Sequence, residues 1–393
     1  MVDAPIRVCL VSPGLLPVPA TQGGAIETLM TTLMRQNERF HRMDLTVVSP
    51  DEPKARKLAE EYRSTRVVFL QSPGLPYKVA NRVRNLWNRK KRSYVSAYYA
   101  KALAAVKKAG PFDAVVVEGG PCDALAPYED YCDDALMYHL HYDPTTPFHS
   151  TGYSRVIAVS EYVANSWKRN CLDPVTDVRV AHNGIDVSKF QREFTEEDRK
   201  AIRARLGFAS DDFVALYCGR IIEVKGVLEL LKAVQRIDDD RVKLMVVGSP
   251  DFAKSSRTPY LDKVQSLVDE LGDRVAFTGY VPNDQVYQYS KSADVQVVPS
   301  LWEDAAPTVC MEAMAAGLPL LVTRSGGMQE YTTPECAVTV EKDERIVDSL
   351  ADALRELSGD SKGLESMSEA ALLRSRKYTE ESFYREFVET IGE

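Results

Sequence analysis

The sequence predicts an α/β protein with two domains, each built around a parallel sheet. Short apolar runs alternate with helical stretches along the chain, which is typical of strands joined by right-handed helical crossovers. The alternation occurs in two sets, and the turn signal Asn183-Gly184 lies near the seam between them. A chain of 393 residues is also too long for one ordinary core and fits two domains.

The expected strands divide between the two sets, and a helix in the first set is expected from Gly23-Gly24 to about Arg39. Strands of the first set are expected at 6–12, 45–49, 66–70, 114–118, 136–141 and 155–160. The second set is expected to begin at Val178 and to continue at 214–219, 243–248, 275–279, 295–300 and 318–323. The seam between the domains is expected within 186–195, and the closing helix at 379–391.

Two cations follow an expected strand of the second set. Gly219, after the run Val214–Cys218, lets the backbone turn tightly over the sheet edge, where ligands of open α/β sheets bind. Arg220 presents a planar fork that matches phosphate oxygens, and Lys225 presents a mobile point charge. Together they could neutralise a leaving diphosphate, as a metal ion would. The alternative is an Arg and a Lys on an ordinary protein surface.

Two carboxylates flank a turn between a strand and a helix expected at 308–316. Asp304 precedes Glu312 by eight positions, so one could hold a sugar and the other the ribose hydroxyls of a nucleotide. The backbone amides at the helix start are unpaired donors that favour an anion such as a diphosphate. Glu312 could be an ordinary solvated residue, but its neighbours are small and apolar, and a carboxylate in such surroundings needs a partner.

Several motifs in order carry a resemblance to a known family. They are Leu16–Glu27, Val180–Asp186, Gly219-Arg220-x4-Lys225-Gly226, Gly279–Pro282, Asp304-x7-Glu312 followed by Ala-Met-Ala-Ala-Gly-Leu-Pro, and Gly326-Gly327-x-x-Glu330. On these motifs the chain resembles the retaining glycosyltransferases of family 4, of the bacterial cell-surface polysaccharide or coat type.

The resemblance implies the GT-B architecture, in which two Rossmann-like, doubly wound domains enclose an interdomain cleft. It implies an acceptor-side domain at 1–187, a nucleotide-sugar-binding domain at 188–378, and a C-terminal helix at 379–393 that crosses back to the first domain. It also implies transfer of a sugar, with retention, from a nucleoside diphosphate donor, expected to be a UDP-sugar, to a hydroxyl of a glycan, lipid-linked or protein acceptor. The implied enzyme is a metal-independent hexosyltransferase that needs no cofactor besides its donor.

The residues expected at the site come from the matching motifs. Those expected to act in catalysis are His141, Arg220, Lys225 and Asp304. Those expected to bind the donor are Gly23, Gly24, Gly219, Tyr280, Val281, Glu303, Pro307, Thr308, Val309 and Glu312, and no metal ligands are expected. His141 stands at the family's histidine position, but His139 shares its face of the strand, so the pattern leaves open which imidazole meets a ligand. Glu27 is expected to cap a helix rather than to react.

The chain departs from the family pattern in the loop before the helix. Asp304 stands where the family usually has Glu, and Ala305-Ala306-Pro307 stands where it has Pro-Phe-Gly. The carboxylate is one methylene shorter, and Pro307 lacks a backbone donor. The donor sugar is therefore the property least transferable from the family.

Composition and charge exclude other classes. A net charge of -8 argues against nucleic acid as a partner. Seven scattered cysteines without a Cys-x-x-Cys pair indicate small buried hydrophobes in a reducing compartment. The N-terminus shows no export signal, and no apolar run approaches the roughly 18 to 20 residues of a membrane span. A cytoplasmic location is therefore expected.

One segment is basic although the chain as a whole is acidic. Residues 77–110 contain ten Lys and Arg residues and no acidic residue, interleaved with aromatic residues. The segment could contact an anionic membrane surface, peripherally at the inner face, or a diphosphate-linked lipid acceptor. The alternative is a solvated helix face of no further function.

Two other functional classes stay open. A sugar-nucleotide epimerase could share the architecture and the diphosphate site, but would carry a different set of acids and bases. A catalytically inactive glycosyltransferase-like partner subunit would bind nucleotide without transferring a sugar, and the departures at Asp304 and Pro307 are compatible with it.

Overall fold

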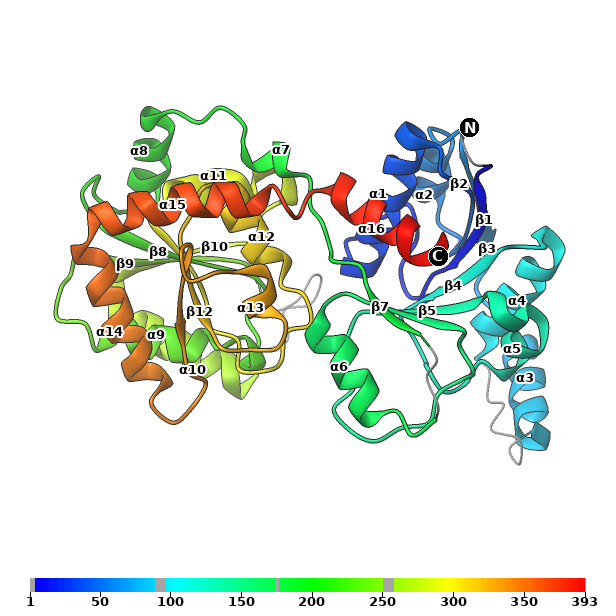
Figure 1. The fold of residues 1–393 in the computed structure, drawn as a ribbon. Coiled ribbons are helices and arrows are strands. Elements are labelled where there is room, and N and C mark those ends of the chain that lie inside the picture. The colour runs from blue at the N-terminus through cyan, green and yellow to red at the C-terminus, as the bar shows by residue number, and fades with distance from the viewer. Residues whose placement is uncertain (1–3, 89–95, 174–176, 250–257, 393) are drawn as a thin grey trace. The chain divides into compact units, whose positions relative to one another are not determined.

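Every strand of the described residues that pairs into a sheet belongs to one of two parallel sheets, which lie in separate units of the chain (Figure 1). The computed structural model describes residues 4–88, 96–173, 177–249 and 258–392, without the side chains of 84–88. One unit consists of residues 1–184 and 380–393, and the other of residues 185–379. The predicted fold class, two Rossmann-like α/β domains, is confirmed.

The first unit holds a seven-stranded sheet in the order β3-β2-β1-β4-β5-β6-β7. Its strands are β1 Ile6–Val11, β2 Met43–Pro50, β3 Thr65–Leu70, β4 Ala114–Glu118, β5 Leu136–Leu140, β6 Arg155–Ala158 and β7 Val178–Val180. The expectation that the strand at Val178 opens the second set is wrong, because β7 pairs with β6 and completes the first sheet. Central strands such as β4 are continuous apolar runs because helices cover both faces of a parallel sheet.

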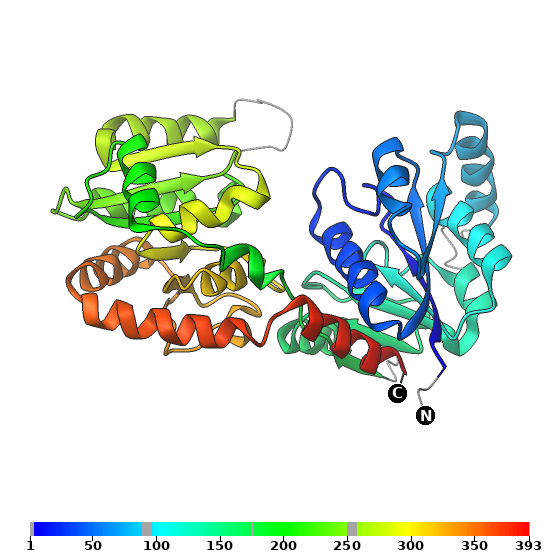
Figure 2. The same ribbon diagram turned by 90° about the horizontal axis from the view of Figure 1, so that it is seen from above.

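Seven helices are described in the first unit. They are α1 Ala25–Phe40, α2 Pro53–Ala59, α3 Leu75–Asn88, α4 Ala97–Ala109, α5 Ala126–Cys132, α6 Glu161–Asn170 and α16 Glu380–Gly392. The last helix, α16, lies beside α1, as Figure 2 shows, although more than 300 residues separate them. Phe383 and Phe387 of α16 join the core formed by β1, β2 and α1. A side-chain hydrogen bond from Gln36 to Glu380, 3.0 Å long, adds a polar contact between the two helices.

The second unit holds a six-stranded parallel sheet in the order β10-β9-β8-β11-β12-β13. Its strands are β8 Phe213–Cys218, β9 Val242–Val247, β10 Val275–Gly279, β11 Val295–Val298, β12 Leu320–Thr323 and β13 Ala337–Val340, of which β13 was not expected. Its helices are α7 Val187–Phe190, α8 Glu196–Arg205, α9 Val227–Gln235, α10 Pro259–Leu271, α11 Val286–Ser292, α12 Thr308–Ala315, α13 Met328–Tyr331, α14 Ile346–Gly359 and α15 Ser361–Ser375.

Strand order reverses once in each sheet, between β1 and β4 in the first and between β8 and β11 in the second. All carboxyl ends of a parallel sheet lie on one edge, and ligands bind at that edge where the order reverses. The loops after β1, β8 and β11 are therefore the places where the fold itself predicts a site. None of the described helices combines the length and the apolar character needed to cross a membrane.

Candidate functional site

An ion pair joins the two loops at the switch point of the second sheet. Nζ of Lys225, after β8, lies 2.8 Å from Oδ1 and 3.0 Å from Oδ2 of Asp304, after β11. Asp304 is only 8% exposed, and it also accepts a hydrogen bond from the hydroxyl of Ser300. Nζ of Lys225 lies 4.9 Å from the ring centre of Trp302, a cation–π contact. The ammonium group of Lys225 is therefore held in one place at the carboxyl edge of the sheet.

Two glycines allow these loops to approach so closely. Gly226 has φ of 71°, and a Cβ atom there would lie 2.0 Å from the carbonyl oxygen of Pro299. Gly326 has φ of 53°, and a Cβ atom there would lie 2.2 Å from the carbonyl oxygen of Asp304. That same oxygen accepts a hydrogen bond of 2.8 Å from the amide of Gly327. A side chain at either glycine would force the loops apart.

Arg220 is exposed, and its guanidinium group has no hydrogen-bond or ion-pair partner among the described residues. The hydroxyl of Tyr217 donates to the carbonyl oxygen of Arg220 at 2.6 Å, which fixes the backbone of the loop. Gly219, with φ of 151°, makes the turn that begins this loop. The structure therefore leaves Arg220 available to an anion, while its neighbouring predicted cation, Lys225, is already paired.

Glu303, the acid next to Asp304, is bound by protein groups. Its two carboxylate oxygens accept from the backbone amide of Gly326 and from the ammonium group of Lys342. Of the three carboxylates predicted at the site, Asp304 and Glu303 are thus engaged in the described structure.

Glu312 is the third, and it has no hydrogen-bonding partner for its carboxyl group among the described residues. It lies in the second turn of α12, beside the buried Met311 and Ala313. Burial among these neighbours raises the pKa of Glu312 to about 7, although Lys189 acts in the opposite direction. The carboxyl group therefore changes its charge near neutral pH and retains unused hydrogen-bonding capacity.

The start of α12 offers backbone donors to the same region. Pro307 is the N-cap residue and provides no side-chain cap. The amides of Thr308 and Val309 have no partner within the part of the chain that the structure describes. Free amides at a helix start favour an anion. These amides come after strand β11, as Asp304 does.

Tyr280 and Val281 follow β10, two strands from β8 in the sheet order. The side chain of Tyr280 is 67% exposed. Val281 packs against the apolar cluster that contains Phe190 and Val286. No contact in the structure joins Tyr280 to Arg220 or Glu312, so its predicted role at the donor stays a prediction.

A buried carboxylate and two imidazoles meet at the carboxyl edge of the first sheet. Oε2 of Glu118, the last residue of β4, lies 2.8 Å from Nδ1 of His139 and 3.0 Å from Nε2 of His141. Burial alone would raise the pKa of Glu118, but the two imidazoles outweigh it and lower the pKa to about 2. Since an ionised carboxylate only accepts hydrogen bonds, both imidazoles donate to Glu118.

The two histidines differ in access. His139 is completely buried and packs against Phe383 and Phe387 of α16. The side chain of His141 is 8% exposed, and its pKa is lowered to about 4, mainly by burial and further by His139. His141 is therefore a neutral imidazole at neutral pH, and it is the better placed of the two to meet a ligand. Two buried atoms of this cluster have no hydrogen-bond partner among the described residues, Oε1 of Glu118 and Nε2 of His139.

The same cluster contains the kind of atoms that bind divalent metals. One atom from each of Glu118, His139 and His141 lies within 4.8 Å of the other two, and this is the one such group in the described ranges. Hydrogen bonds from the imidazoles to the carboxylate already account for these distances. The absence of a metal from the reaction stays a prediction.

The glycines after β1 begin α1. Gly24 is the N-cap residue with φ of 95°, and Gly23 has φ of 84°. A Cβ atom on Gly24 would lie 2.2 Å from Oε2 of Glu27, which is folded back over the helix start. The carboxylate of Glu27 is buried and receives backbone amides of its own residue and of Leu16. Glu27 thus serves the helix start, and the pKa of its carboxyl group is raised by burial.

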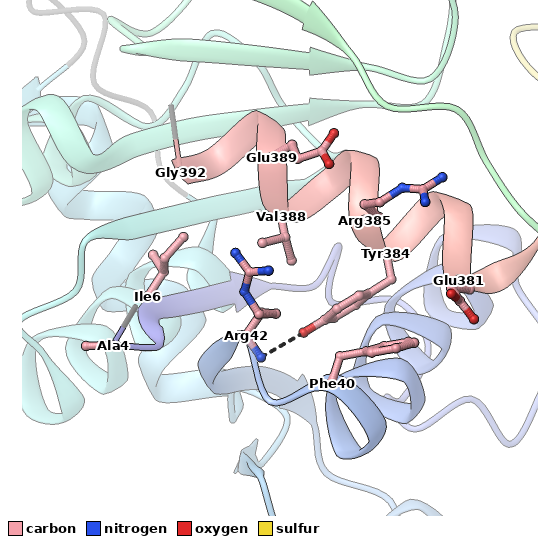
Figure 3. A pocket seen from close by; sticks show the side chains of 10 residues that line it. All are labelled: Ala4, Ile6, Phe40, Arg42, Glu381, Tyr384, Arg385, Val388, Glu389 and Gly392. Carbon is pink, nitrogen blue, oxygen red and sulfur yellow. Dashed lines mark hydrogen bonds between the residues drawn. The ribbon is translucent and has the colours of Figure 1, made fainter. Parts of the chain in front are cut away.

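A hollow of about 770 Å³ lies at the opposite edge of the first sheet (Figure 3). It is lined by the beginning of β1 at Ile6, by Phe40 and Arg42, and by Tyr384 and Val388 of α16. The amide of Arg42 donates to the hydroxyl of Tyr384 at 3.2 Å across its floor. None of the predicted site residues lines this hollow, because they all follow the carboxyl ends of strands.

Sequence reasoning missed several residues that hold the site together. They are Glu118, Ser300, Trp302 and Lys342. Glu118 carried a signal, because a carboxylate that ends a run of valines must be paired once it is buried. Lys342 carried none, since it lies 39 residues from Glu303 along the chain.

The fold is found in solved glycosyltransferases of the GT-B class. The crystal structure of Anabaena HepE in complex with UDP and glucose superposes with a TM-score of 0.74 over 98% of this chain and 99% of HepE, at 18% sequence identity. At that identity the likeness establishes the fold.

The match to a family model lies within the second unit. Residues 198–374 match the family described as Glycosyl transferases group 1. The lipopolysaccharide 1,2-N-acetylglucosaminetransferase of Salmonella typhimurium is 31% identical over 201 residues, which is 50% of this chain and 50% of that enzyme. The putative glycosyltransferase YtcC of Bacillus subtilis is 25% identical over 385 residues, covering 94% of this chain and 86% of YtcC.

Replacing Glu312 by Gln is expected to stabilise the protein at high pH. The folded pKa of about 7 exceeds the ordinary value of 4.5, so stability is lost as the pH rises through this window and the carboxylate ionises. At about pH 8 the free energy of unfolding of Glu312→Gln is expected to exceed that of the parent by about 1–2 kcal/mol. This figure is smaller than the full pKa shift implies because Glu312 is partly exposed to solvent. The difference is expected to vanish near about pH 5. Urea unfolding at both pH values measures it. The exposed Glu344→Gln is the control, and an equal difference at both pH values would contradict the account.

Replacing Glu118 by Gln is expected to destabilise the first unit. The folded pKa of about 2 lies below the ordinary 4.5, so the carboxylate stabilises the fold above about pH 4.5 and loses this effect as the pH falls toward 2. Glu118→Gln is expected to cost about 3 kcal/mol near pH 7 and distinctly less near about pH 3.5. Denaturant unfolding with the exposed Glu61→Gln as control checks this. A cost that does not change with pH would show that the charge of Glu118 is unimportant.

Proposed function

We propose that the chain is a retaining glycosyltransferase of family 4 that moves a sugar from a UDP-sugar to a hydroxyl acceptor in glycan or glycoconjugate synthesis. One observation carries the proposal. At the switch point of the second sheet, the fixed ammonium of Lys225, the unpartnered guanidinium of Arg220 and the unpartnered carboxyl of Glu312 follow strands β8 and β11. These groups suit a nucleoside diphosphate.

The residues take distinct parts in the proposed reaction. Arg220, Lys225 and the free amides of α12 bind the diphosphate, and Glu312 accepts hydrogen bonds from the ribose hydroxyls. Asp304 keeps the ammonium of Lys225 in position, and its remaining lone pairs can accept from the donor sugar. The role proposed for Asp304 thus combines the expected contact to sugar with the contact to Lys225 found in the structure.

Retention follows if the leaving group acts as the base. The bond between the anomeric carbon and the diphosphate oxygen breaks, and the acceptor oxygen bonds to the same face of that carbon. The acceptor's proton passes to the departing phosphate oxygen. The cations stabilise the charge that develops on the diphosphate.

The known relatives support UDP as the nucleotide and a cell-surface product. HepE has been crystallised with UDP-glucose, and the Salmonella relative is a lipopolysaccharide N-acetylglucosaminetransferase. We place the reaction in the cytoplasm, which agrees with seven free cysteines. We also propose that no metal is needed, because Arg220 and Lys225 provide the positive charge. Activity that disappears with chelator and returns with a metal would overturn that part.

Replacing Arg220 by Ala is expected to lower kcat about 10²- to 10³-fold, the usual effect of removing one electrostatic donor to a transition state. The free energy of unfolding is expected to stay within about 0.5 kcal/mol, since the side chain is exposed and unpartnered. Turnover with UDP-sugar and unfolding are measured together. Arg345→Ala, an exposed arginine of the same unit, is the matched control. Undiminished turnover in Arg220→Ala would refute the assignment.

The donor can be identified by thermal shift with UDP-, GDP-, dTDP- and ADP-sugars. A ligand at about 100 times its Kd adds about 2.7 kcal/mol to stability, which is easily seen as a rise in Tm. The rise is expected for UDP-sugars and to shrink in Glu312→Gln. No rise with any nucleotide would remove the support for the proposed function.

Two incubations distinguish a transferase from the two other functional classes, a sugar-nucleotide epimerase and an inactive subunit. Donor alone would yield an epimer if the protein were a sugar-nucleotide epimerase, whereas a transferase yields at most slow hydrolysis. A protein that binds nucleotide but gives neither transfer nor hydrolysis with any acceptor extract would be an inactive subunit. The anomeric configuration of a product, read by NMR coupling constants, tests retention.

A further inference from the structure

Helix α3 exposes an apolar stripe to solvent. The side chains of Leu75, Val79 and Val83 are 75%, 55% and 49% exposed. They are spaced by four residues, so at 100° per residue they lie within 80° of one another on the helix. Isolated exposed aliphatic residues are normal, but three in line on one helix mark a contact surface. We call these three residues the α3 stripe.

The opposite face of α3 holds the helix to the rest of the first unit. Asn81 is 6% exposed, and Tyr77 lies one turn before it on the same face. Nζ of Lys101, in α4, lies 5.2 Å from the ring centre of Tyr77. The anchored side is therefore already packed, and the stripe faces away from the domain, where the described residues provide no cover.

Positive charge flanks the stripe. Lys78 and Arg82 are exposed and lie at its border, three residues after Leu75 and Val79. Residues 62–112 contain 12 Lys and Arg residues and no Asp or Glu. The chain as a whole has a net charge of -8, so the rest of it carries -8 minus 12, or -20. The sequence segment that contains α3 is thus basic in an otherwise strongly acidic chain.

The helix lies at the edge of the sheet that carries the candidate site. α3 begins five residues after the carboxyl end of β3 at Leu70, and His141 follows the carboxyl end of β5. In a parallel sheet these ends share one edge, and α3 packs against α4 in the first unit. A surface bound by α3 would therefore lie next to the edge of the first sheet that holds His141.

We infer that α3 docks on an anionic lipid bilayer, with the α3 stripe in the headgroup–acyl boundary and Lys78 and Arg82 at the lipid phosphates. An amphipathic helix binds such a boundary through buried apolar area together with attraction of its basic residues to anionic lipids. This deepens the proposed function and rests on it in one respect. The docked edge selects an acceptor that is itself lipid-anchored, with its hydroxyl at the membrane surface.

Vesicle binding tests the inference without any sugar substrate. The full chain is sedimented with vesicles of phosphatidylcholine alone and of phosphatidylcholine mixed with phosphatidylglycerol. Binding is expected to the mixed vesicles only, and to weaken as salt is raised. Two variants separate the contributions. Leu75→Ser/Val79→Ser/Val83→Ser removes the stripe and keeps the charge, and Lys78→Glu/Arg82→Glu reverses the charge and keeps the stripe.

Each variant is expected to lose at least about tenfold in partitioning to mixed vesicles. All substituted side chains are exposed, so circular dichroism and Tm are expected to be unchanged. The controls make the same kinds of change on the second unit. Leu373→Ser replaces an exposed leucine, and Lys200→Glu/Lys362→Glu replaces two exposed lysines. Both controls are expected to bind like the parent.

Several results would overturn the inference. No binding, equal binding to neutral vesicles, or the same loss in the controls would exclude specific docking by α3. A concentration-dependent dimer in light scattering that the serine variant abolishes would assign the stripe to a second copy instead. Reduced turnover of the variants with a fully soluble acceptor would assign the surface to the acceptor glycan.

The inference and the proposed function fail separately. Loss of vesicle binding with intact UDP-dependent thermal shift would reject the docking helix and leave the transferase in place. Vesicle binding without any nucleotide shift would reject the transferase and keep α3 as a membrane-docking helix.

Discussion

The ion pair between Lys225 and Asp304 is the contact on which the rest of the second unit's site depends. Removing two charges from water costs free energy, and the pair regains it only because Asp304 also accepts from Ser300. Its value is therefore placement rather than stability. A free lysine side chain would sample many rotamers, whereas this ammonium is fixed where strand order reverses. Gly226 and Gly326 have backbone conformations that permit the two loops to meet. The ion pair can therefore form at the place where the strand order reverses.

Glu312 differs from Asp304, because its carboxyl group is desolvated but has no hydrogen-bond partner among the described residues. Such a group reduces the stability of the ligand-free protein at high pH, when the carboxylate is ionised. Hydroxyl donors from a ligand would satisfy the carboxylate and lower its pKa again. The free energy of binding then includes relief of this unfavourable state, which makes a small number of hydrogen bonds count for more than they would on an exposed surface. If Glu312 binds the donor as proposed, affinity and stability are coupled through this one side chain.

The fold could be predicted from the sequence because buried parallel strands are continuous apolar runs with clear limits, as in β4 and β9. The short strand β7 was assigned to the wrong sheet, since three residues carry no information on which neighbour they will pair with. The motif residues of the site were predicted individually, but their pairing was not. Lys225 and Asp304 lie 79 residues apart, and Glu118 and His141 lie 23 apart. The sheet topology brings the loops after β8 and β11 to one edge, and the hydrogen bonds between Lys225 and Asp304 show that they are partners rather than separate binding groups.

The two units differ in the charges that their candidate site residues carry at neutral pH. In the first unit Glu118 is ionised and fully occupied by two imidazoles, and His141 is neutral because its pKa is about 4. Because the neutral imidazole of His141 donates from Nε2 to Glu118, its Nδ1 can only accept a hydrogen bond. At neutral pH it does not supply positive charge to a departing diphosphate. In the proposed reaction that task must therefore fall to Arg220 and Lys225 of the second unit. In that reaction His141 would orient hydroxyl groups. The most basic part of the first unit's sequence is residues 62–112, with 12 Lys and Arg residues and no Asp or Glu.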